Sequence, residues 1–261
     1  MNKVLFEVDS DPRIAWIKLN ASKINVLNLE MLEDLYNAIL MAEKGENSAI
    51  ILSSSQENFC AGADLKELKS LSFEEGIKWF ERYIEVVKLL RNSSKPVIAA
   101  VRGFCVAGGN EIAMACDIVV ASKNAKFGQP EVKVGSTALG LGVQLLPLII
   151  GEKRARELLL TGRIIDAEEA LRIGLINRVV DDEKLEETAK SIAIEIVENC
   201  SPKAFRVIKS GLNFWTDLAM VSAQLSRDIT SLIWASSEFK ERSEEFLHGK
   251  KLSPKKFNGI K

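Results

Sequence analysis

Two glutamates stand directly behind turn-forming residues, where a carboxylate can face a bound molecule. The stretch VAGGNEIAMACD (106–117) predicts an almost apolar helix that glycines open and that carries Glu111 in its first turn. Glu131 follows a glycine, a glutamine and a proline at the end of a predicted short strand, 126–131. Each acid also has an ordinary interpretation. Asn110 is a favourable N-cap, an acid in a first turn gains about 0.3–1 kcal/mol from the helix dipole, and Glu131 would be an exposed strand-end acid.

Histidine is almost absent, which narrows the chemistry that the chain can perform. The single histidine, His248, lies in a lysine-rich tail. A hydrolase that needs a histidine base and a zinc site with histidine ligands are therefore both disfavoured. Proton transfer must come from carboxylates, lysines or tyrosines, and the chain has only two tyrosines, Tyr36 and Tyr83. The four cysteines have no paired metal-ligand spacing and are expected to be structural; they are Cys60, Cys105, Cys116 and Cys200.

Composition and charge indicate a globular protein without a nucleic-acid or membrane partner. Of 261 residues, 47% are hydrophobic and 27% are charged, and 35 Lys and Arg nearly balance 36 Asp and Glu. No global field therefore attracts nucleic acid or an anionic membrane. The N-terminal stretch lacks the apolar core of a signal peptide, and no apolar run approaches the roughly 20 residues that span a bilayer. We expect a cytoplasmic protein with no nucleic-acid or membrane partner.

Strand-like and helical segments alternate along the chain, which predicts an α/β fold with strand–helix crossovers. Strands are expected at 14–20, 48–54, 96–103, 117–122, 126–131 and 175–180. Helices are expected at 27–44, 73–93, 106–117, 140–150, 152–161 and 167–173, and 183–247 is mostly helical.

A boundary is expected near residue 200. Ser201 can cap a new helix and Pro202 suits its first position. We therefore divide the chain into a core, 1–200, and a C-terminal helical region, 201–261. The second region carries much aromatic and aliphatic surface, which must be buried against the core or another subunit, so we expect a homo-oligomer.

Three segments taken together resemble the crotonase, or enoyl-CoA hydratase/isomerase, superfamily. They are FCAGADLKEL (59–68), KPVIAAVRGFCVAGGNEIAMACDIVVAS (95–122), and AKFGQPEVKVG (125–135) with the downstream GEKRARELLLTGRIIDAEEALRIGLINRVV (151–180). The similarity covers nearly the whole chain, and the joint pattern is specific although each glycine motif by itself is weak. The resemblance implies a spiral of ββα turns followed by a helical trimerisation region. It also implies an enzyme for acyl-CoA thioesters that works as a homotrimer or a dimer of trimers.

The resemblance further implies roles for the two glutamates. Family members form an enolate, or an enolate-like transition state, from the thioester carbonyl, and the developing charge needs preorganised N–H donors. By position these donors are the amides of Ala63 and Gly108, the latter at a helix N-terminus. Glu131 matches the principal acid–base residue for the α-carbon proton, and Glu111 matches its partner in activating water. Retention of both glutamates is similar to the hydratases, so the implied reaction is hydration of the 2,3 double bond by a lyase.

Substrate contacts are carried over from the same motifs. The ligand-lining loop includes the segment 61–65, basic side chains near the adenosine phosphates are expected at two lysines, and one leucine lies near the acyl end. The residues implied in substrate binding are Ala61, Ala63, Asp64, Leu65, Lys66, Gly108, Lys23 and Leu139. The basic tail, 248–256, is a further candidate for phosphate contact. No metal or redox cofactor is implied, because coenzyme A is part of the substrate.

Two departures from common hydratases leave alternatives open. After Gly135 the chain reads STALGLGVQLLPLIIG (136–151) instead of a proline and a glycine-rich turn ending in Thr-Gln-Arg, and NASKINVL (20–27) lacks the usual Arg-Pro pair. A cyclic dienoyl-CoA hydratase or an enoyl-CoA isomerase of the same superfamily is therefore an alternative. A non-enzymatic RNA-binding or scaffold protein would be marked by a missing glutamate or a strong basic stripe, and the sequence has neither.

Overall fold

A six-stranded sheet forms the centre of the computed structural model, which describes residues 3–256 apart from the side chains of residues 219, 220 and 223. The strand order is β1-β2-β4-β6-β8-β11, with β1 antiparallel to β2 and the other neighbours parallel. The strands are β1 (Val4–Val8), β2 (Ile14–Leu19), β4 (Ala49–Ser54), β6 (Val97–Val101), β8 (Ile118–Ser122) and β11 (Arg178–Val180).

Two smaller sheets are built from the strands that follow those of the large sheet. One pairs β3 (Val26–Leu27) with β5 (Gly62–Ala63), and the other has the order β10-β9-β7. Its strands are β7 (Phe104–Val106), β9 (Lys126–Gly128) and β10 (Ile164–Asp166). From β2 to β9, successive strands thus alternate between the large sheet and a small sheet. The spiral of ββα turns expected from the resemblance is present.

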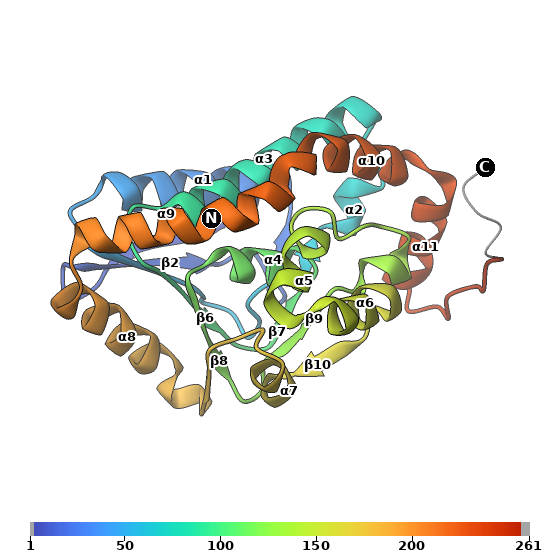
Figure 1. Ribbon diagram of the computed structural model, residues 1–261. Coiled ribbons are helices and arrows are strands. Elements are labelled where there is room, and N and C mark those ends of the chain that lie inside the picture. The colour runs from blue at the N-terminus through green and yellow to red at the C-terminus, as the bar shows by residue number, and fades with distance from the viewer. Residues whose placement is uncertain (1–2, 257–261) are drawn as a thin grey trace.

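Helices cover both faces of the large sheet, as Figure 1 shows. The helices of the core are α1 (Leu29–Lys44), α2 (Leu65–Leu68), α3 (Phe73–Asn92), α4 (Gly108–Ala115), α5 (Gly142–Ile150), α6 (Glu152–Thr161), α7 (Ala167–Arg172) and α8 (Leu185–Asn199). Side chains alternate along β4: Ile50 and Leu52 join the core beneath α1 and α3, while Ile51 packs toward α8. Burial of both faces explains why the first four residues of this strand, 49–52, are all apolar.

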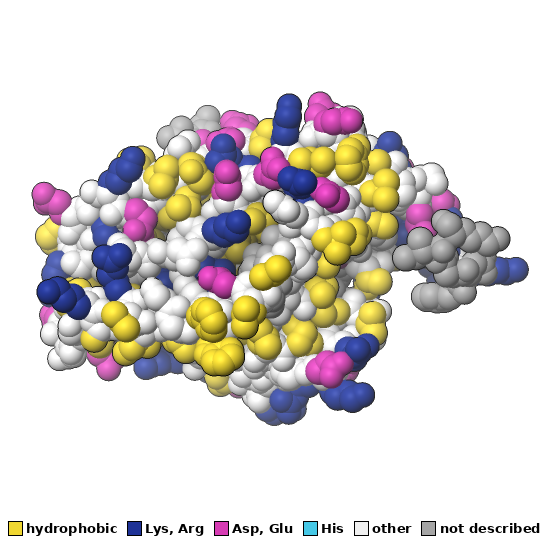
Figure 2. All heavy atoms as spheres, turned by 45° about the horizontal axis from the view of Figure 1, so that its top comes forward, with side chains coloured by type: hydrophobic (Ala, Val, Ile, Leu, Met, Phe, Trp, Pro, Cys, Tyr) yellow, Lys and Arg dark blue, Asp and Glu magenta, His cyan; other side chains and the backbone are white. Residues whose placement is uncertain are grey.

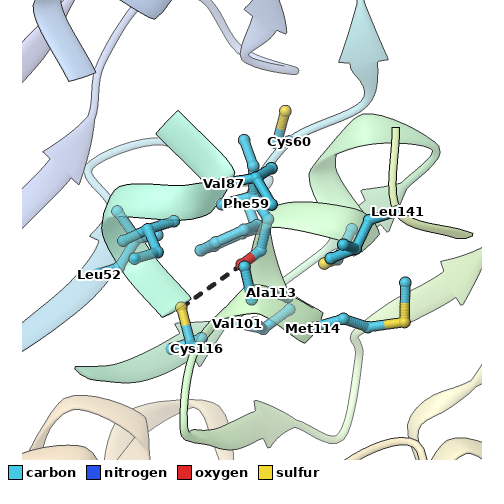
Figure 3. Packing of buried hydrophobic residues seen from close by; sticks show 14 of the residues in the cluster. Leu52, Phe59, Cys60, Val87, Val101, Ala113, Met114, Cys116 and Leu141 are labelled. Carbon is cyan, nitrogen blue, oxygen red and sulfur yellow. Dashed lines mark hydrogen bonds between the residues drawn. The ribbon is translucent and has the colours of Figure 1, made fainter. Parts of the chain in front are cut away.

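Close packing surrounds α4, the helix that carries Glu111. Figure 3 shows Phe59, Val87 and Val101 gathered near Ala113 of α4. Gly109 is required here, because a Cβ atom at that position would lie 2.3 Å from the carbonyl oxygen of Cys60. The start of α4 is therefore held against the segment that leads into β5.

The cysteines behave as structural residues in three of four positions. Cys60, Cys105 and Cys116 are buried, Cys200 is exposed, and all four are free. Burial raises the pKa of Cys60 to about 12, so that its thiol stays protonated. The Cys116 thiol donates to the carbonyl oxygen of Ile112 at 3.5 Å (Figure 3).

Helical segments after residue 200 return along the core. They are α9 (Pro202–Ala219), the 3₁₀ turn η3 (Met220–Ser222), α10 (Ala223–Ala235) and α11 (Ser237–Leu247). As expected, α9 begins at Pro202, and the Ser201 hydroxyl accepts a bond from the amide of Ala204 at 3.4 Å. A partly buried ion pair fixes α9, since Lys209 Nζ lies 2.7 Å from Asp117 Oδ2. Helix α10 packs along α3.

Several boundaries differ from the sequence expectation. The helix expected from residue 27 begins at Leu29, because 26–27 form β3. The strand expected over 126–131 ends at Gly128, and a short 3₁₀ helix, η1 (Pro130–Val134), follows. Within the described residues, no helix combines the length and apolarity needed to cross a membrane.

Candidate active site

Both candidate glutamates line one small cavity, so the two carboxyl groups converge as the sequence analysis expected. The cavity has a volume of about 40 Å³, enough for a few water molecules at roughly 10–15 Å³ each. Its walls come from α3, the turn before α4, the loop before α5 and α10. The lining residues are Trp79, Phe80, Tyr83, Ala107, Gly108, Glu111, Glu131, Thr137, Gly140, Thr230 and Trp234. A larger hollow of about 470 Å³ lies over α7, but it is an open, acidic surface depression without a buried acid–base pair.

Glu111 is held by three hydrogen-bond donors. Its Oε1 atom accepts from the amides of Leu141 at 2.8 Å and Gly142 at 2.6 Å. Its Oε2 atom accepts from the hydroxyl of Tyr83 at 2.7 Å. Burial raises the pKa of Glu111, and the three donors oppose that rise because they favour the ionised form. The N-terminal end of α4 also favours a negative charge in this first turn.

Glu131 has a different environment, although it lines the same cavity. It lies in η1 and is 9% exposed, which corrects the interpretation of an exposed strand-end acid. Its Oε2 atom has no hydrogen-bond partner among the described residues. Burial, followed by the charge of Glu111, raises the pKa of Glu131 well above its ordinary value. Glu131 therefore keeps its proton more readily than Glu111, which separates an acid from a base.

The turn before α4 brings Gly108 to the cavity wall. Ala107 occupies a left-handed conformation, φ 52° and ψ −131°, which costs a non-glycine residue about 1–3 kcal/mol. Its amide donates to the carbonyl oxygen of Gly128 at 2.9 Å, so the turn is fixed by β9. Gly108 then takes the first helical position, where the amide has no acceptor within the helix. Asn110 lies inside α4 and is not the N-cap, which corrects that expectation.

The amide of Ala63 lies on the neighbouring strand. Leu27 is paired with Ala63 in the parallel ladder, and the amide of Asp64 donates to the carbonyl oxygen of Leu27 at 2.8 Å. In this parallel pairing Leu27 bonds to the residue after Ala63 and not to Ala63 itself. The amide of Ala63 therefore faces away from β3. A Cβ atom on Gly62 would lie 3.3 Å from the amide nitrogen of Gly108. The two candidate oxyanion donors thus come from adjoining backbone segments.

The other expected substrate contacts lie around β3 and β5. The amide of Ala61 donates to the carbonyl oxygen of Ile24 at 3.0 Å, and Leu65 is half-buried against the core. Asp64 is the N-cap of α2, and its carboxylate accepts from the amide of Lys66 at 2.9 Å. The side chain of Lys66 is exposed.

Of the expected substrate contacts only Gly108 lines the cavity, and the residues outside its wall are Ala61, Ala63, Asp64, Leu65, Lys66, Lys23 and Leu139. Lys23 is exposed, and its Nζ atom pairs with Glu57 at 3.0 Å. Leu139 is not among the residues that line the cavity, and its carbonyl oxygen accepts from Gln144 Nε2 at 3.0 Å. The structure therefore gathers Glu111, Glu131 and Gly108 around the cavity and leaves the lysines at the surface.

Sequence reasoning did not assign the aromatic wall of the site. Trp79 stacks on Tyr83 with centroids 5.6 Å apart, and Trp234 meets Trp79 edge-on at 5.3 Å. The indole N–H of Trp234 donates to the Ser136 hydroxyl at 2.8 Å, which fixes the ring. The scarcity of tyrosine was the one sequence signal that pointed to Tyr83. The described residues contain no cluster of three His, Cys, Asp or Glu side chains able to hold a metal ion.

Comparison with known proteins identifies the family. Residues 9–252 match the sequence profile of the family described as Enoyl-CoA hydratase/isomerase. The chain is 42% identical over 216 residues to a short-chain-enoyl-CoA hydratase of Clostridium acetobutylicum, covering 82% of each protein. It is 36% identical to a crotonyl-CoA hydratase of Syntrophomonas wolfei, covering 94% of this chain and 95% of that protein. The crystal structure of an enoyl-CoA hydratase/isomerase from Xanthobacter autotrophicus Py2 superposes with a TM-score of 0.85 at 31% identity, over 94% of this chain and 93% of the other. The chain therefore belongs to the enoyl-CoA hydratase/isomerase family, and has its crotonase fold.

Proposed function

We propose that this protein is an enoyl-CoA hydratase, a hydro-lyase that adds water across the 2,3 double bond of an acyl-CoA thioester. The observation that carries the proposal is the pair of buried glutamates at one cavity, of which one is held by three donors and the other has an oxygen without a partner. The names of the relatives from Clostridium acetobutylicum and Syntrophomonas wolfei support the same activity.

In the proposed reaction the two glutamates act on opposite ends of one water addition. The carboxylate of Glu111 takes a proton from water as the water oxygen attacks the β-carbon. Protonated Glu131 gives its proton to the α-carbon. The negative charge that develops on the thioester oxygen is stabilised by the amides of Ala63 and Gly108. The reverse sequence dehydrates a 3-hydroxyacyl-CoA.

A short acyl group fits the cavity better than a long or cyclic one. The volume of about 40 Å³ is small, and Trp79 and Trp234 are buried side chains that wall it. The printed names of the two relatives, short-chain and crotonyl, agree with this restriction. An isomerase needs one acid–base group to move a proton between carbons, so a second buried glutamate favours hydration. The cyclic dienoyl-CoA hydratase is the second candidate, because the segment 136–151 departs from common hydratases.

Replacement of Glu131 by glutamine tests the function. Removal of a general acid typically costs 10²–10⁴-fold in rate, and we expect kcat for crotonyl-CoA hydration to fall by roughly that factor. KM should change little, because glutamine keeps the size of the side chain. The loss of ultraviolet absorbance of the conjugated thioester measures the rate. Glu157→Gln, a surface change on α6, serves as the control. Full activity of the Glu131 variant would reject the assignment.

Coenzyme A contacts at the protein surface are part of the proposal. We assign Ala61, Asp64 and Leu65 to the loop beside the ligand, and Lys23 and Lys66 to the adenosine phosphates. Both lysines are exposed, so each contributes a modest, salt-dependent attraction. Lys66→Ala should raise KM more at low salt than at high salt.

No partner is proposed besides acyl-CoA and copies of the chain, and the proposed location is the cytoplasm.

We also propose that the C-terminal region, 201–261, forms contacts between copies of the chain, as a homotrimer or a dimer of trimers. Helices α9 and α10 leave a large set of apolar side chains exposed, and Figure 2 shows hydrophobic groups gathered on this side of the molecule. They are Val207, Ile208, Leu212, Phe214, Trp215, Leu218, Leu225, Ile229 and Leu232. A concentration of exposed apolar side chains of this kind marks a site of contact with another protein surface.

Sedimentation tests the assembly. Trp215 is 70% exposed on α9, so Trp215→Lys should lower the sedimenting mass while the separate chain stays folded. Val8→Lys, at an exposed position of β1, is the matched control and should keep the assembly. Wild-type protein that sediments as a monomer would contradict the proposal.

A further inference from the structure

We propose that Tyr83 is a positioning residue for the base Glu111, an inference that rests on the proposed hydratase function. The Tyr83 hydroxyl donates to Glu111 Oε2 at 2.7 Å inside the cavity. It is the one side-chain donor to this carboxylate among the described residues, since the other two donors are backbone amides. Tyr83 comes from α3, so it ties the base to a different element from the one that carries it.

The ring of Tyr83 has little freedom to move. Trp79 stacks on one face at an interplanar angle of 15°, and the side chain is 2% exposed. Two glycines make room for the ring. A Cβ atom on Gly140 would lie 2.5 Å from Tyr83 Cε1, and a Cβ atom on Gly108 would lie 3.3 Å from the hydroxyl. The hydroxyl is therefore held beside the carboxylate, as a preorganised donor must be.

The Tyr83 hydroxyl donates to Glu111 rather than to the carbonyl oxygen of Gly108, its second possible acceptor. Tyr83 Oη also lies 3.1 Å from the carbonyl oxygen of Gly108, but a phenol has one proton to donate. The bond to Glu111 is shorter and is assisted by the carboxylate charge. Burial, followed by the charge of Glu111, raises the pKa of Tyr83 well above 10, so the phenol stays protonated and remains a donor.

The bond fixes both the direction and the ionisation of the base. With Oε1 held by Leu141 and Gly142, and Oε2 held by Tyr83, the carboxylate plane cannot rotate. A donor to the charged form also lowers the pH at which Glu111 loses its proton. Tyr83 thereby widens the difference between Glu111 and Glu131, which has no such donor on Oε2.

The titratable groups around Glu111 are few. Tyr83 faces it from α3 and Glu131 from η1, while Cys60, before β5, and Cys105, in β7, are buried thiols. Within the described residues, no Lys, Arg or His side chain forms an ion pair with either glutamate. Among the side chains, the Tyr83 hydroxyl therefore stabilises the ionised Glu111 carboxylate, as a cation does in other carboxylate sites.

The experiment compares Tyr83→Phe with Tyr36→Phe. Tyr36 is the only other tyrosine, and it lies on α1 under the Arg82 guanidinium, away from the cavity. The kcat and KM for crotonyl-CoA are measured from pH 5 to pH 9, in the range where the wild-type enzyme is stable. For Tyr83→Phe we expect kcat to fall by about 10–100-fold, with KM within about twofold. The acid limb of the kcat/KM profile should move to higher pH, because Glu111 loses a donor to its ionised form. Tyr36→Phe should match the wild type.

Different outcomes separate the inference from the proposed function. Wild-type protein that hydrates no enoyl-CoA would remove the proposed function itself. An active wild type with an unmoved acid limb in Tyr83→Phe would overturn the positioning role, even if the rate falls evenly at all pH values. Should Tyr83→Phe fold poorly, 3-fluorotyrosine incorporated in the Tyr36→Phe background labels Tyr83 only. The more acidic phenol strengthens the bond, so the acid limb should then move to lower pH, and an unmoved limb would again overturn the inference.

Discussion

A single methyl group at Gly140 should disable the site, because the space for it is already occupied. Gly140 packs against both Tyr83 and Glu111. A Cβ atom there would lie 2.5 Å from Tyr83 Cε1 and 2.6 Å from Glu111 Oε2. Ordinary contact begins near 3.4 Å, so the ring atom would have to retreat by about 0.9 Å and the oxygen by about 0.8 Å. Neither can move freely, since Trp79 stacks on the ring and the carboxylate has three donors.

The displacement sets the size of the effect. Misplacing a catalytic group by about 1 Å costs roughly 10²-fold in rate, so we expect Gly140→Ala to lower kcat by about that factor. Overpacking a buried site also costs about 1–3 kcal/mol of stability. The two quantities are measured by the hydration assay and by urea unfolding of the same preparation.

A second glycine provides the control. Gly76 lies in α3, and a Cβ atom there would be 3.4 Å from Ser231, an ordinary contact. Gly76→Ala should keep the activity and leave the free energy of unfolding unchanged or raise it by about 0.5–1 kcal/mol, because alanine favours a helix interior. If Gly140→Ala behaves like this control, the reasoning about crowding around Glu111 is wrong.

Three further predictions concern the wall, the acids and a buried amide. Trp234→Leu opens the cavity wall, so the kcat/KM for an eight-carbon enoyl-CoA should rise relative to that for a four-carbon enoyl-CoA. The free energy of unfolding should fall by about 1–3 kcal/mol. An unchanged kcat/KM ratio would show that the wall does not set chain length. Burial raises the pKa of Glu131 above its unfolded value, so its protonated form contributes stability fully below pH 4.5 and loses that contribution as the pH rises through the folded pKa. Urea titrations from pH 5 to pH 9 should therefore show a steeper decline for the wild type than for Glu131→Gln, and parallel curves would contradict this. Asn25 is buried with φ 45°, and its side-chain amide donates to the Ser54 hydroxyl at 2.8 Å. Asn25→Ala should therefore lower the free energy of unfolding, measured in urea, by roughly 2–4 kcal/mol. A loss below about 0.5 kcal/mol would refute the anchoring role of this side chain.

Long periodic segments and paired motifs could be predicted from the sequence, because their signals are local. The helix expected at 73–93 and the strand expected at 48–54 agree with α3 and β4 within one residue. The convergence of Glu111 and Glu131 was also predicted, but it depended on the resemblance, since each glutamate has an ordinary local interpretation. Two-residue strands such as β5 could not be predicted, because they have no periodicity.

Errors arose where a distant contact decides the local structure. Asn110 is a good N-cap by type, yet β9 holds the amide of Ala107 and starts the helix earlier in the chain. The bond from Tyr83 to Glu111 joins residues 28 positions apart, and no local pattern encodes such a separation. Tertiary packing therefore supplied the details of the site that local propensity left open.

The location of Trp234 and Thr230 on α10 has a consequence for biosynthesis. Both residues lie about a hundred positions after the two acids in the sequence, so they leave the ribosome later than the acids do. A nascent chain that ends before α10 therefore carries its proton-transfer groups in an unsealed crevice open to bulk solvent. The pocket wall is therefore completed only after α10 has been made, and a chain that stops at residue 222 contains both glutamates but lacks Thr230 and Trp234.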